Sequence, residues 1–260
     1  MQTSSAFFVM DKKKGVCPML PGDIQQRSRQ NQEKELGSYM SRVLREHFGR
    51  GPESVYVSLD PHSVVIHIRR FLAPMEEVLL EQRGKEAIEE LRETMMANML
   101  PEMAHAIYQL TGKEDWSFFV DWNISNRSGM VTALHEPSFQ HQPSLAESPH
   151  QASLREGVRN VSQRTEKEPG TVHAHQINDR TLVVVRTDVL IMIEKELIRI
   201  GHRKSLKTVK RQLEKRLLYE EQFSQRLGVG VRDIFVDWDF DKDNSVVVLL
   251  TDPLPRPKEE

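Results

Sequence analysis

Val120-Asp121-Trp122 returns later in the chain as Val236-Asp237-Trp238, and this repetition decides the fold. The second occurrence follows the first by 116 residues. Upstream, Pro52-Glu53-Ser54-Val55 returns as Pro169-Gly170-Thr171-Val172, 117 residues later. We therefore interpret the chain as two copies of one domain of about a hundred residues, a common domain size. The segments between these anchors keep their order, with residues 65–69 aligned to 182–186 and Glu77 aligned to Glu194.

Length and composition are consistent with two soluble domains in a chain of 260 residues. The single cysteine, Cys17, excludes an internal disulfide. No apolar run approaches the roughly 20 residues that span a bilayer. The net charge of −2 predicts no global attraction to nucleic acid. We expect a disordered leader at 1–30, copy one at 31–135, a flexible linker at 136–151, copy two at 152–253 and a tail at 254–260.

Hydrophobic periodicity predicts the same α-β-β-α-β-β plan in each copy. Pro101 predicts a kink or break in the long helix of copy one. The fold class is α+β, with two tandem domains that each place helices on a four-stranded antiparallel sheet. In copy one we expect helices at 32–49, at 75–82 and from about 85, with strands at 54–59, 64–70, 116–124 and 129–134. In copy two we expect a first helix at 152–164 and strands at 171–176, 181–187, 231–240 and 245–251.

The repeated Asp-Trp pair is the strongest candidate site. Neighbouring residues of a strand point to opposite faces of its sheet. In a scaffold role, tryptophan fills the core while Asp121 and Asp237 lie on the outer face or cap a turn. In a functional role, that outer face binds a partner, with the two aspartates, Arg69 and Arg186 as polar anchors. The scaffold role is favoured, because large aromatic side chains carry much of core burial.

The segment Arg69-Arg70-Phe71-Leu72-Ala73-Pro74-Met75 places apolar residues beside arginines. This combination suits a protein interface, which makes Arg69, Phe71 and Pro74 candidate contacts. A strand-to-helix junction buried in the core explains the same pattern at least as well. A Phe71→Ser variant distinguishes the two, since unfolding indicates the core and loss of a partner from a folded protein indicates the interface.

Residues 199–216 hold eight basic residues and one acid, Glu214. This basic helix is a solvated face, a surface for phosphate groups of nucleic acid or lipid, or the partner of an acidic helix in another repeat. The matching part of copy one contains four glutamates between 86 and 93. The phosphate interpretation ranks last, because no aromatic residues are interleaved for base stacking. The candidate basic patch consists of Arg203, Lys204, Lys207, Lys210 and Arg211.

We predict no catalytic residue, no cofactor and no metal site. Residues 237–243 alternate acidic side chains as a calcium loop does, but the positions that require glycine and glutamate hold other residues. His173 and His175 share one strand face, yet a closed zinc site needs more ligands. A Gly-x-Ser-x-Gly nucleophile motif and a glycine-rich phosphate loop are both lacking. We therefore expect a protein that is not an enzyme.

The repeated segments resemble the MpsC-like family, with copy two more divergent at residues 187–191. The resemblance implies a bacterial cytoplasmic protein, an accessory part of a membrane system linked to sodium, membrane potential and inorganic carbon, and it supplies no catalytic residue. The segments that carry it in copy one are Gly-Pro-Glu-Ser-Val at 51–55, Val-Ile-His-Ile-Arg at 65–69, Phe-Leu-Ala-Pro-Met-Glu at 71–76, Val-Asp-Trp-Asn at 120–123 and Gly-Met at 129–130.

Two functional hypotheses follow. The first is a non-enzymatic accessory or regulatory protein whose repeats pair as an intramolecular pseudo-dimer, or assemble as a homo-oligomer. It would bind a protein partner in a cation- or bicarbonate-related membrane transport complex, from the cytoplasmic side and peripheral to the membrane. The alternative is a nucleic-acid-binding regulator that uses the basic helix at 199–216, with a steep salt dependence of binding as its signature.

Overall fold

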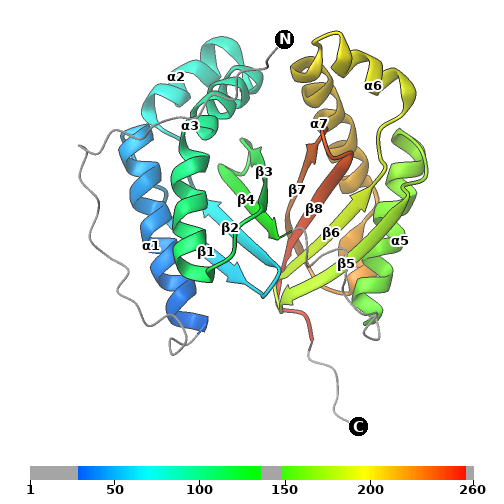
Figure 1. Cartoon of the computed structure of the whole chain (residues 1–260), viewed down its shortest axis with the longest axis horizontal. Helices are drawn as coiled ribbons and strands as arrows, with labels where there is room; N and C mark the ends of the chain where they lie inside the picture. The colour runs from blue at the N-terminus through cyan, green and yellow to red at the C-terminus, as the bar shows by residue number, and fades with distance from the viewer. Residues whose placement is uncertain (1–28, 136–147, 256–260) are drawn as a thin grey trace, which may run out of the picture.

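Each repeat contains one four-stranded antiparallel sheet, and the two sheets form the middle of the molecule (Figure 1). The computed structural model describes residues 29–135 and 148–255. The expected leader, linker and tail therefore lie largely outside the described residues. Within the described ranges, the α+β class and the α-β-β-α-β-β plan of both copies are confirmed, with strand bounds within two residues of the prediction.

In copy one the strand order is β1-β2-β4-β3, and α1 and α3 cover one face of the sheet. The spacing of Leu36, Met40 and Leu44 gives α1 a buried stripe because residues four apart share a helix face. Copy one comprises α1 (Arg29–Phe48), β1 (Ser54–Leu59), β2 (Ser63–Arg69), α2 (Pro74–Arg83), α3 (Lys85–Thr111), β3 (Trp116–Asn123) and β4 (Ser128–His135).

Pro101 does not divide the long helix of copy one, because α3 continues through it from Lys85 to Thr111. Pro101 itself is exposed, whereas Met96, Met99 and Met103 on either side of it are buried in the core. Packing on both sides of the proline therefore offsets the loss of one helical hydrogen bond. Gly112 ends the helix in a left-handed conformation, with φ of 67°.

Copy two has the equivalent strand order β5-β6-β8-β7. Its first helix begins at Pro149, three residues before the predicted start, because Ser148 forms a capping box with Gln151. The Ser148 Oγ accepts the Gln151 N–H at 3.3 Å, and Gln151 Oε1 accepts the Ser148 N–H at 2.9 Å. Copy two comprises α5 (Pro149–Thr165), β5 (Thr171–Asn178), β6 (Thr181–Thr187), α6 (Met192–Arg199), α7 (Arg203–Glu220), α8 (Phe223–Leu227), β7 (Val231–Asp239) and β8 (Asn244–Thr251).

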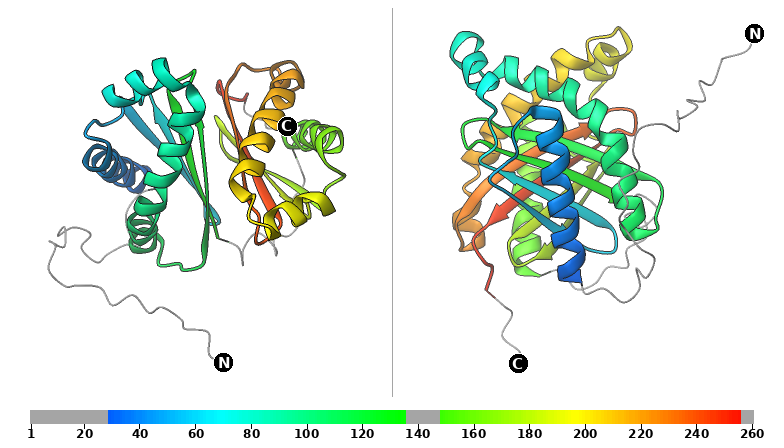
Figure 2. Two further views of the ribbon diagram at one scale, coloured as in Figure 1. Left: turned by 90° about the horizontal axis from the view of Figure 1, so that it is seen from above. Right: turned by 90° about the vertical axis from the view of Figure 1, so that its left-hand side faces the viewer.

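The faces of the two sheets that carry no helices pack against each other, so the molecule has four layers, with helices outside and sheets inside (Figures 1 and 2). Successive residues of a strand point to opposite faces of its sheet, so each strand contributes both to the core of its own copy and to the contact with the other sheet. In β4, for example, Val131 faces the helices of its own copy and Met130 faces the other sheet. Apolar residues from both copies form this shared core: Val65, Phe119, Met130, Leu134, Ile177, Val183, Val185, Phe235, Val246, Val248 and Leu250.

Candidate functional site

The repeated aspartates meet at the contact between the two sheets, where each binds the backbone of the other copy. Asp121 Oδ2 accepts the N–H of Val236 at 2.9 Å. Asp237 Oδ2 accepts the N–H of Val120 at 2.7 Å. The exchange is reciprocal, so β3 and β7 are related by an approximate two-fold axis. Trp122 and Trp238 point the other way, into the cores of their own copies.

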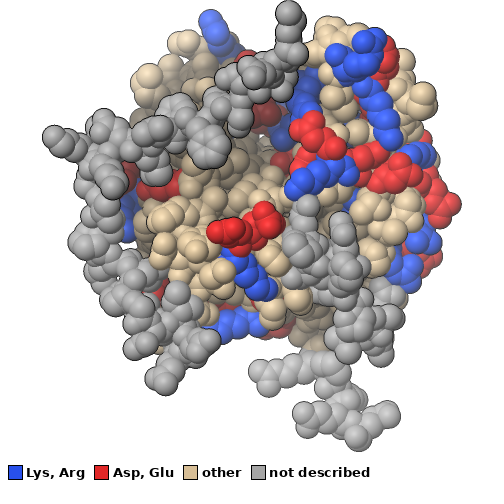
Figure 3. Space-filling view, in the orientation of Figure 1, with Lys and Arg blue, Asp and Glu red and all other residues tan. Residues whose placement is uncertain are grey.

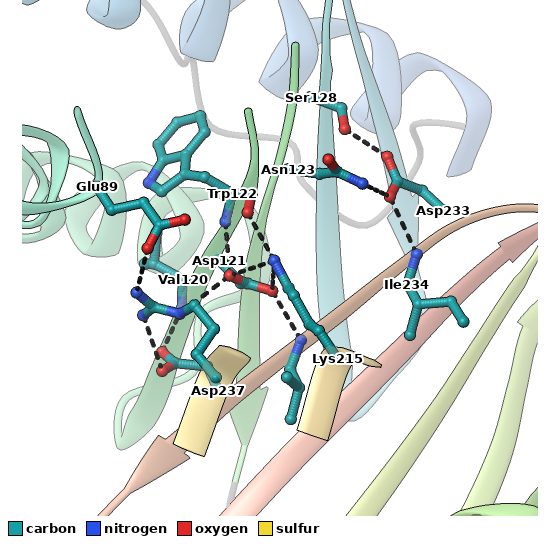
Figure 4. A network of polar contacts seen from close by, with 12 residues as sticks. Glu89, Val120, Asp121, Trp122, Asn123, Ser128, Lys215, Asp233, Ile234 and Asp237 are labelled. Atoms are coloured by element: carbon teal, nitrogen blue, oxygen red, sulfur yellow. Dashed lines mark hydrogen bonds and ion pairs between the residues drawn. The ribbon is translucent and has the colours of Figure 1, made fainter. Parts of the chain in front are cut away.

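Helix α7 supplies the cations that neutralise these buried aspartates (Figure 4). Lys215 Nζ lies 2.8 Å from Asp121 Oδ2, and Lys207 Nζ lies 2.8 Å from Asp237 Oδ1. Arg211 lies between them, 3.2 Å from Asp121 and 3.8 Å from Asp237. Glu89 of α3 adds a third carboxylate, 3.8 Å from Arg211. We call these six residues the inter-repeat seam, and its three cations balance its three carboxylates.

Protonation states in the seam follow from burial and charge. Burial alone would lower the pKa of Arg211, but Asp121, Asp237 and Glu89 outweigh it and raise that pKa. Burial raises the pKa of Glu89, against the opposing effect of Arg211 and Lys215. Each charge therefore meets its opposite within the protein, and this fixes the relative register of the two sheets.

A second polar contact joins the copies beside the seam. Asn123 Nδ2 of copy one donates to Asp233 Oδ1 of copy two at 2.8 Å, and the Ser128 hydroxyl also donates to Asp233. Tyr219 donates to the same carboxylate at 3.2 Å. Burial and the Asp233 charge raise the pKa of Tyr219, so its hydroxyl keeps its proton. These contacts extend the pairing of the repeats rather than form a reactive centre.

The basic helix, α7, faces the acidic helix of copy one, α3. This arrangement agrees with the interpretation in which the charges of the two repeats pair with each other. Lys204 Nζ lies 3.1 Å from Glu90 of α3, and Gln212 bonds Glu86 at 3.5 Å. Over this side of the molecule, Lys and Arg alternate with Asp and Glu on the visible surface (Figure 3). Each member of the candidate basic patch has a carboxylate partner: Asp241 for Arg203, Glu90 for Lys204, Asp237 for Lys207, Glu166 and Glu194 for Lys210, and Asp121 for Arg211.

The patch therefore does not form as a free basic surface. Lys210 and Arg211 have side-chain exposures of only 5% and 8%. Lys210 and Arg211 are buried because their part of α7 packs toward its own sheet and toward the seam, whereas Arg203 and Lys204 stay exposed and pair with carboxylates at the surface.

The other candidate contacts divide between core and surface. Phe71 is fully buried and packs edge-to-face on Phe48, with ring centroids 4.9 Å apart, so the core interpretation of the 69–75 segment is correct for it. Arg69 and Pro74 are exposed. Arg186 is buried in the core of copy two and does not lie on an outer face. The outer sheet face proposed as a binding surface is instead covered by the other repeat.

The strand registers also correct two of the pairings made by sequence. Gly129 pairs with Ile68 and Trp122 in copy one, as Ser245 pairs with Arg186 and Trp238 in copy two. Arg186 is therefore equivalent to Ile68, not to Arg69. Likewise Glu194 is equivalent to Glu76, because each closes the first turn of its helix by accepting the N-cap N–H. An offset of 118 residues relates both pairs.

Sequence analysis missed that each copy buries a cation beside its repeated tryptophan. Arg92 of α3 makes a bidentate pair with Glu76, at 2.6 and 2.8 Å, and its guanidinium lies 4.3 Å from the centre of the Trp122 ring. Lys210, 118 residues later, pairs with Glu194 at 2.8 Å and lies 5.5 Å from the Trp238 ring. A sequence signal existed for Arg92, since it is four residues from both Ile88 and Met96 on the buried stripe of α3.

Copy two adds further buried charges around Lys210. Glu166 contacts Lys210, and Glu214 pairs with Arg186 at 2.8 Å. Burial, with the Glu214 charge second, raises the pKa of Glu166 to about 9. We call Glu166, Arg186, Glu194, Lys210 and Glu214 the copy-two ionic cluster.

The metal-binding alternatives find no support in the described ranges. The described residues contain no group of three or more His, Cys, Asp or Glu side chains placed to hold a metal ion. In the stretch that alternates acids, Asp239 accepts two N–H groups of its own turn, Asp241 pairs with Arg203, and Asp243 pairs with Lys195. The alternation thus reflects separate local partners.

Comparison with known proteins identifies the family. A family model described as "Na+-translocating membrane potential-generating system (MpsC)" matches residues 28–136 and again 151–252. No curated protein and no solved structure matches the chain significantly. Among the described residues, no helix has the length and apolar character needed to cross a bilayer. The two matched regions coincide with the two repeats and together cover most of the sequence, so the chain belongs to the MpsC family as a tandem of two copies.

Proposed function

We propose that this protein is a non-enzymatic accessory subunit that binds a protein partner belonging to a membrane system for cations or bicarbonate. It would act from the cytoplasm, at the membrane periphery, without catalytic residues or cofactors. The family description, which names a Na+-translocating system, supports the association with a membrane. The pairing of both repeats into one body supports a binding role, because the seam residues neutralise each other and leave no reactive group.

The observation that carries the proposal is a pair of exposed apolar helix starts at one end of the molecule (Figures 1 and 2). Met75, near the start of α2, is 81% exposed. Met192 and Ile193, which begin α6, are 84% and 62% exposed. Met75 and Ile193 occupy equivalent positions, 118 residues apart. Exposed apolar side chains that recur in this way are typical of a docking surface.

We define the apical surface as Pro74, Met75 and Val78 of α2 together with Met192 and Ile193 of α6. Its two halves are related by the approximate two-fold axis, so a partner can contact both repeats at once. Pro74, a contact candidate from the sequence, lies on this surface, whereas Phe71 lies beneath it in the core. The exposed part of the 69–75 segment therefore remains a candidate contact.

Site-specific photocrosslinking in native cells tests the proposal. A photoreactive amino acid at Met75 or Ile193 should crosslink to an integral membrane protein. The control is Tyr108 near the end of α3, an aromatic side chain that is 41% exposed but lies away from α2 and α6. Crosslinks from Met75 and Ile193 only to soluble proteins or to nucleic acid would refute the membrane-accessory role and favour the regulator hypothesis.

A charge substitution provides the complementary prediction. The variant Met75→Glu/Ile193→Glu should lose the membrane partner in a pull-down, because two carboxylates would need desolvation in an apolar contact. Its free energy of unfolding should change by no more than about 0.5 kcal/mol, since both side chains are exposed. Retention of the partner by this folded variant would exclude the apical surface as the contact.

A further inference from the structure

Three loops of copy one enclose a surface hollow of about 530 Å³ that is rich in arginine. The loop after α1 contributes Arg50 and Glu53, the junction between β2 and α2 contributes Arg70 and Leu72, and the β3–β4 turn contributes Arg127. We call this the arginine hollow. It lies outside the inter-repeat seam, and neither the apical surface nor the pairing of the repeats uses its arginines.

The arginine hollow carries more positive charge than its own carboxylates neutralise. Arg70 pairs with Glu53 at 2.8 Å and Arg127 pairs with Glu77 at 3.3 Å, but all four side chains are more than 40% exposed. Arg50 has no carboxylate within 4.0 Å in the described ranges. Exposed pairs of this kind contribute little stability, so these guanidinium groups remain available to an incoming anion.

Copy two shows what occupies the equivalent place there. Asp243 stands where copy one has Arg127, and the two residues share a left-handed backbone with φ of 50°. The Asp243 carboxylate accepts the N–H groups of Val189 and Leu190, both at 2.8 Å. Lys195 binds its second oxygen at 2.8 Å. In copy two, this loop junction therefore contains a carboxylate that is bound by two backbone N–H groups and by a cation.

Copy one keeps the two N–H groups, but Arg127 replaces Asp243 and Glu77, which is equivalent to Lys195 at the offset of 118, replaces the lysine. Phe71 and Leu72 are equivalent to Val189 and Leu190 at the offset of 118. The Phe71 N–H donates to the Arg127 carbonyl at 2.7 Å. The Leu72 N–H has no acceptor among the residues that the structure describes, although Leu72 is only 3% exposed and lines the arginine hollow. A buried donor without an acceptor is unfavourable, which indicates a missing oxygen ligand.

The backbone conformation of the arginines gives independent support. Arg70 and Arg127 have φ of 47° and 50°, in the left-handed region that is unfavourable for an ordinary residue. Their equivalents, Asp188 and Asp243, belong to a residue type that adopts this region readily. Copy one thus holds arginine where aspartate would fit the backbone better, as functional sites often do.

We propose that the arginine hollow binds the carboxylate group of a small organic acid against the Leu72 N–H, whose equivalent in copy two donates to the Asp243 carboxylate. The Leu72 N–H donates to one carboxylate oxygen. Arg50 and Arg127 supply charge-assisted hydrogen bonds to the other, as Lys195 does for Asp243. Volume and charge together specify a small anionic ligand rather than an apolar one.

NMR titration of the ¹⁵N-labelled full chain with sodium acetate tests the proposal, with sodium chloride at equal ionic strength as the control. The Leu72 amide and the side-chain Nε–H of Arg50 and Arg127 should shift in a saturable way. The Leu190 amide should not move, because Asp243 already occupies its position. Shifts that are absent, unsaturable, or equal for acetate and chloride would overturn the proposal.

Two variants separate binding from folding. Arg50→Gln should bind acetate about tenfold more weakly, since one charge-assisted hydrogen bond is lost, while its amide spectrum otherwise stays native. Arg127→Asp should place an internal carboxylate beside the Leu72 N–H, shift that amide without any acetate, and abolish the titration. Aspartate is compatible with the left-handed backbone there, so the fold should persist. Unchanged acetate binding by folded Arg127→Asp would refute the assignment.

Discussion

Single residues distinguish the two cores more sharply than their shared topology suggests. At four equivalent positions, copy two places polar or charged side chains where copy one is apolar. The replacements, each at the offset of 118, are Leu44 by Ser162, Phe48 by Glu166, Ile68 by Arg186 and Met96 by Glu214. Arg186 donates to Ser162 at 2.8 Å and to Ser245 at 2.7 Å, so its guanidinium is hydrogen-bonded within the core.

The copy-two ionic cluster contains three carboxyl groups but only two cations, Arg186 and Lys210. A fully ionised cluster would leave one buried negative charge without a partner, and a proton on Glu166 removes it. Burial accordingly raises the pKa of Glu166 to about 9, whereas Arg186, against the effect of burial, keeps the pKa of Glu214 low.

Stability should therefore depend on pH through Glu166. Its pKa is about 9 in the folded protein and about 4.5 in the unfolded chain. Between these values unfolding releases a proton, so the contribution of Glu166 to the free energy of unfolding falls as pH rises. In Glu166→Gln, an amide replaces the protonated carboxyl and this dependence disappears. Urea denaturation from pH 5 to pH 8 should show a growing advantage of Glu166→Gln over the parent protein.

Glu168→Gln is the matched control, because Glu168 is two residues away and 61% exposed. Its difference from the parent protein should stay constant over the same pH range. Parallel curves for Glu166→Gln and the parent protein would show that Glu166 is ionised in the folded core.

Among the elements, β3 and β7 determine how the repeats pair. Each strand donates one N–H to the aspartate of the other strand. Helix α7 provides the cations that offset the cost of burying both aspartates in the core. The basic run of α7 is thus explained by burial against carboxylates. A helix with seven cations can pack against the rest of the protein, because the opposing strand and α3 provide matching charges.

Asp121→Ala should lower the free energy of unfolding by about 3–5 kcal/mol, which is typical when one partner of a buried ion pair is removed. The loss leaves the Val236 N–H without its acceptor and Lys215 without its nearest carboxylate. Chemical denaturation of the full chain measures the change. Asp241→Ala serves as the comparison, since this 75% exposed aspartate should contribute no more than about 1 kcal/mol. Similar effects of both variants would contradict a buried role for Asp121.

For the whole molecule, the shared core predicts that the repeats stay together without a covalent link. A protease site inserted within residues 136–147 allows the chain to be cut after folding. The two fragments should then elute together in gel filtration, because the shared core and the seam join them. The Phe235→Asp variant, which buries a charge in the shared core, should release them as separate species. Separation of the unmodified fragments at micromolar concentration would contradict the pairing.

The sequence predicts the fold of each repeat well because its signals are local. Strand alternation alone places Trp122 and Trp238 in the cores, and turn residues bound the strands. The sequence does not reveal what covers the opposite face of each sheet. Asp121 and Asp237 fit equally well beside solvent, a partner protein or the other repeat. Arg186 was misplaced for a related reason: the register irregularity between Gln176 and Asn178 changes the offset from 117 in β1 and β5 to 118 in β2 and β6, and a shift of one residue reverses the face of a strand.

The apical surface, the arginine hollow and the copy-two ionic cluster depend on contacts between distant segments. Arg50, Arg70 and Arg127 come from three loops, and nothing in their individual sequence contexts indicates that they converge. Comparison of equivalent positions in the two copies does identify these arginines, but only after the strand registers have established the offset in residue number between the copies.

The charge division between α3 and α7 also restricts which copies can assemble. At the offset of 118, Lys207 and Arg211 correspond to Glu89 and Glu93. Two first repeats placed across the same axis would set these glutamates against paired Asp121 carboxylates, and two second repeats would crowd six cations around two aspartates. Either like-with-like assembly is repelled. Each repeat therefore requires the other kind of repeat as its neighbour, and a chain with two first or two second copies could not build the same interface.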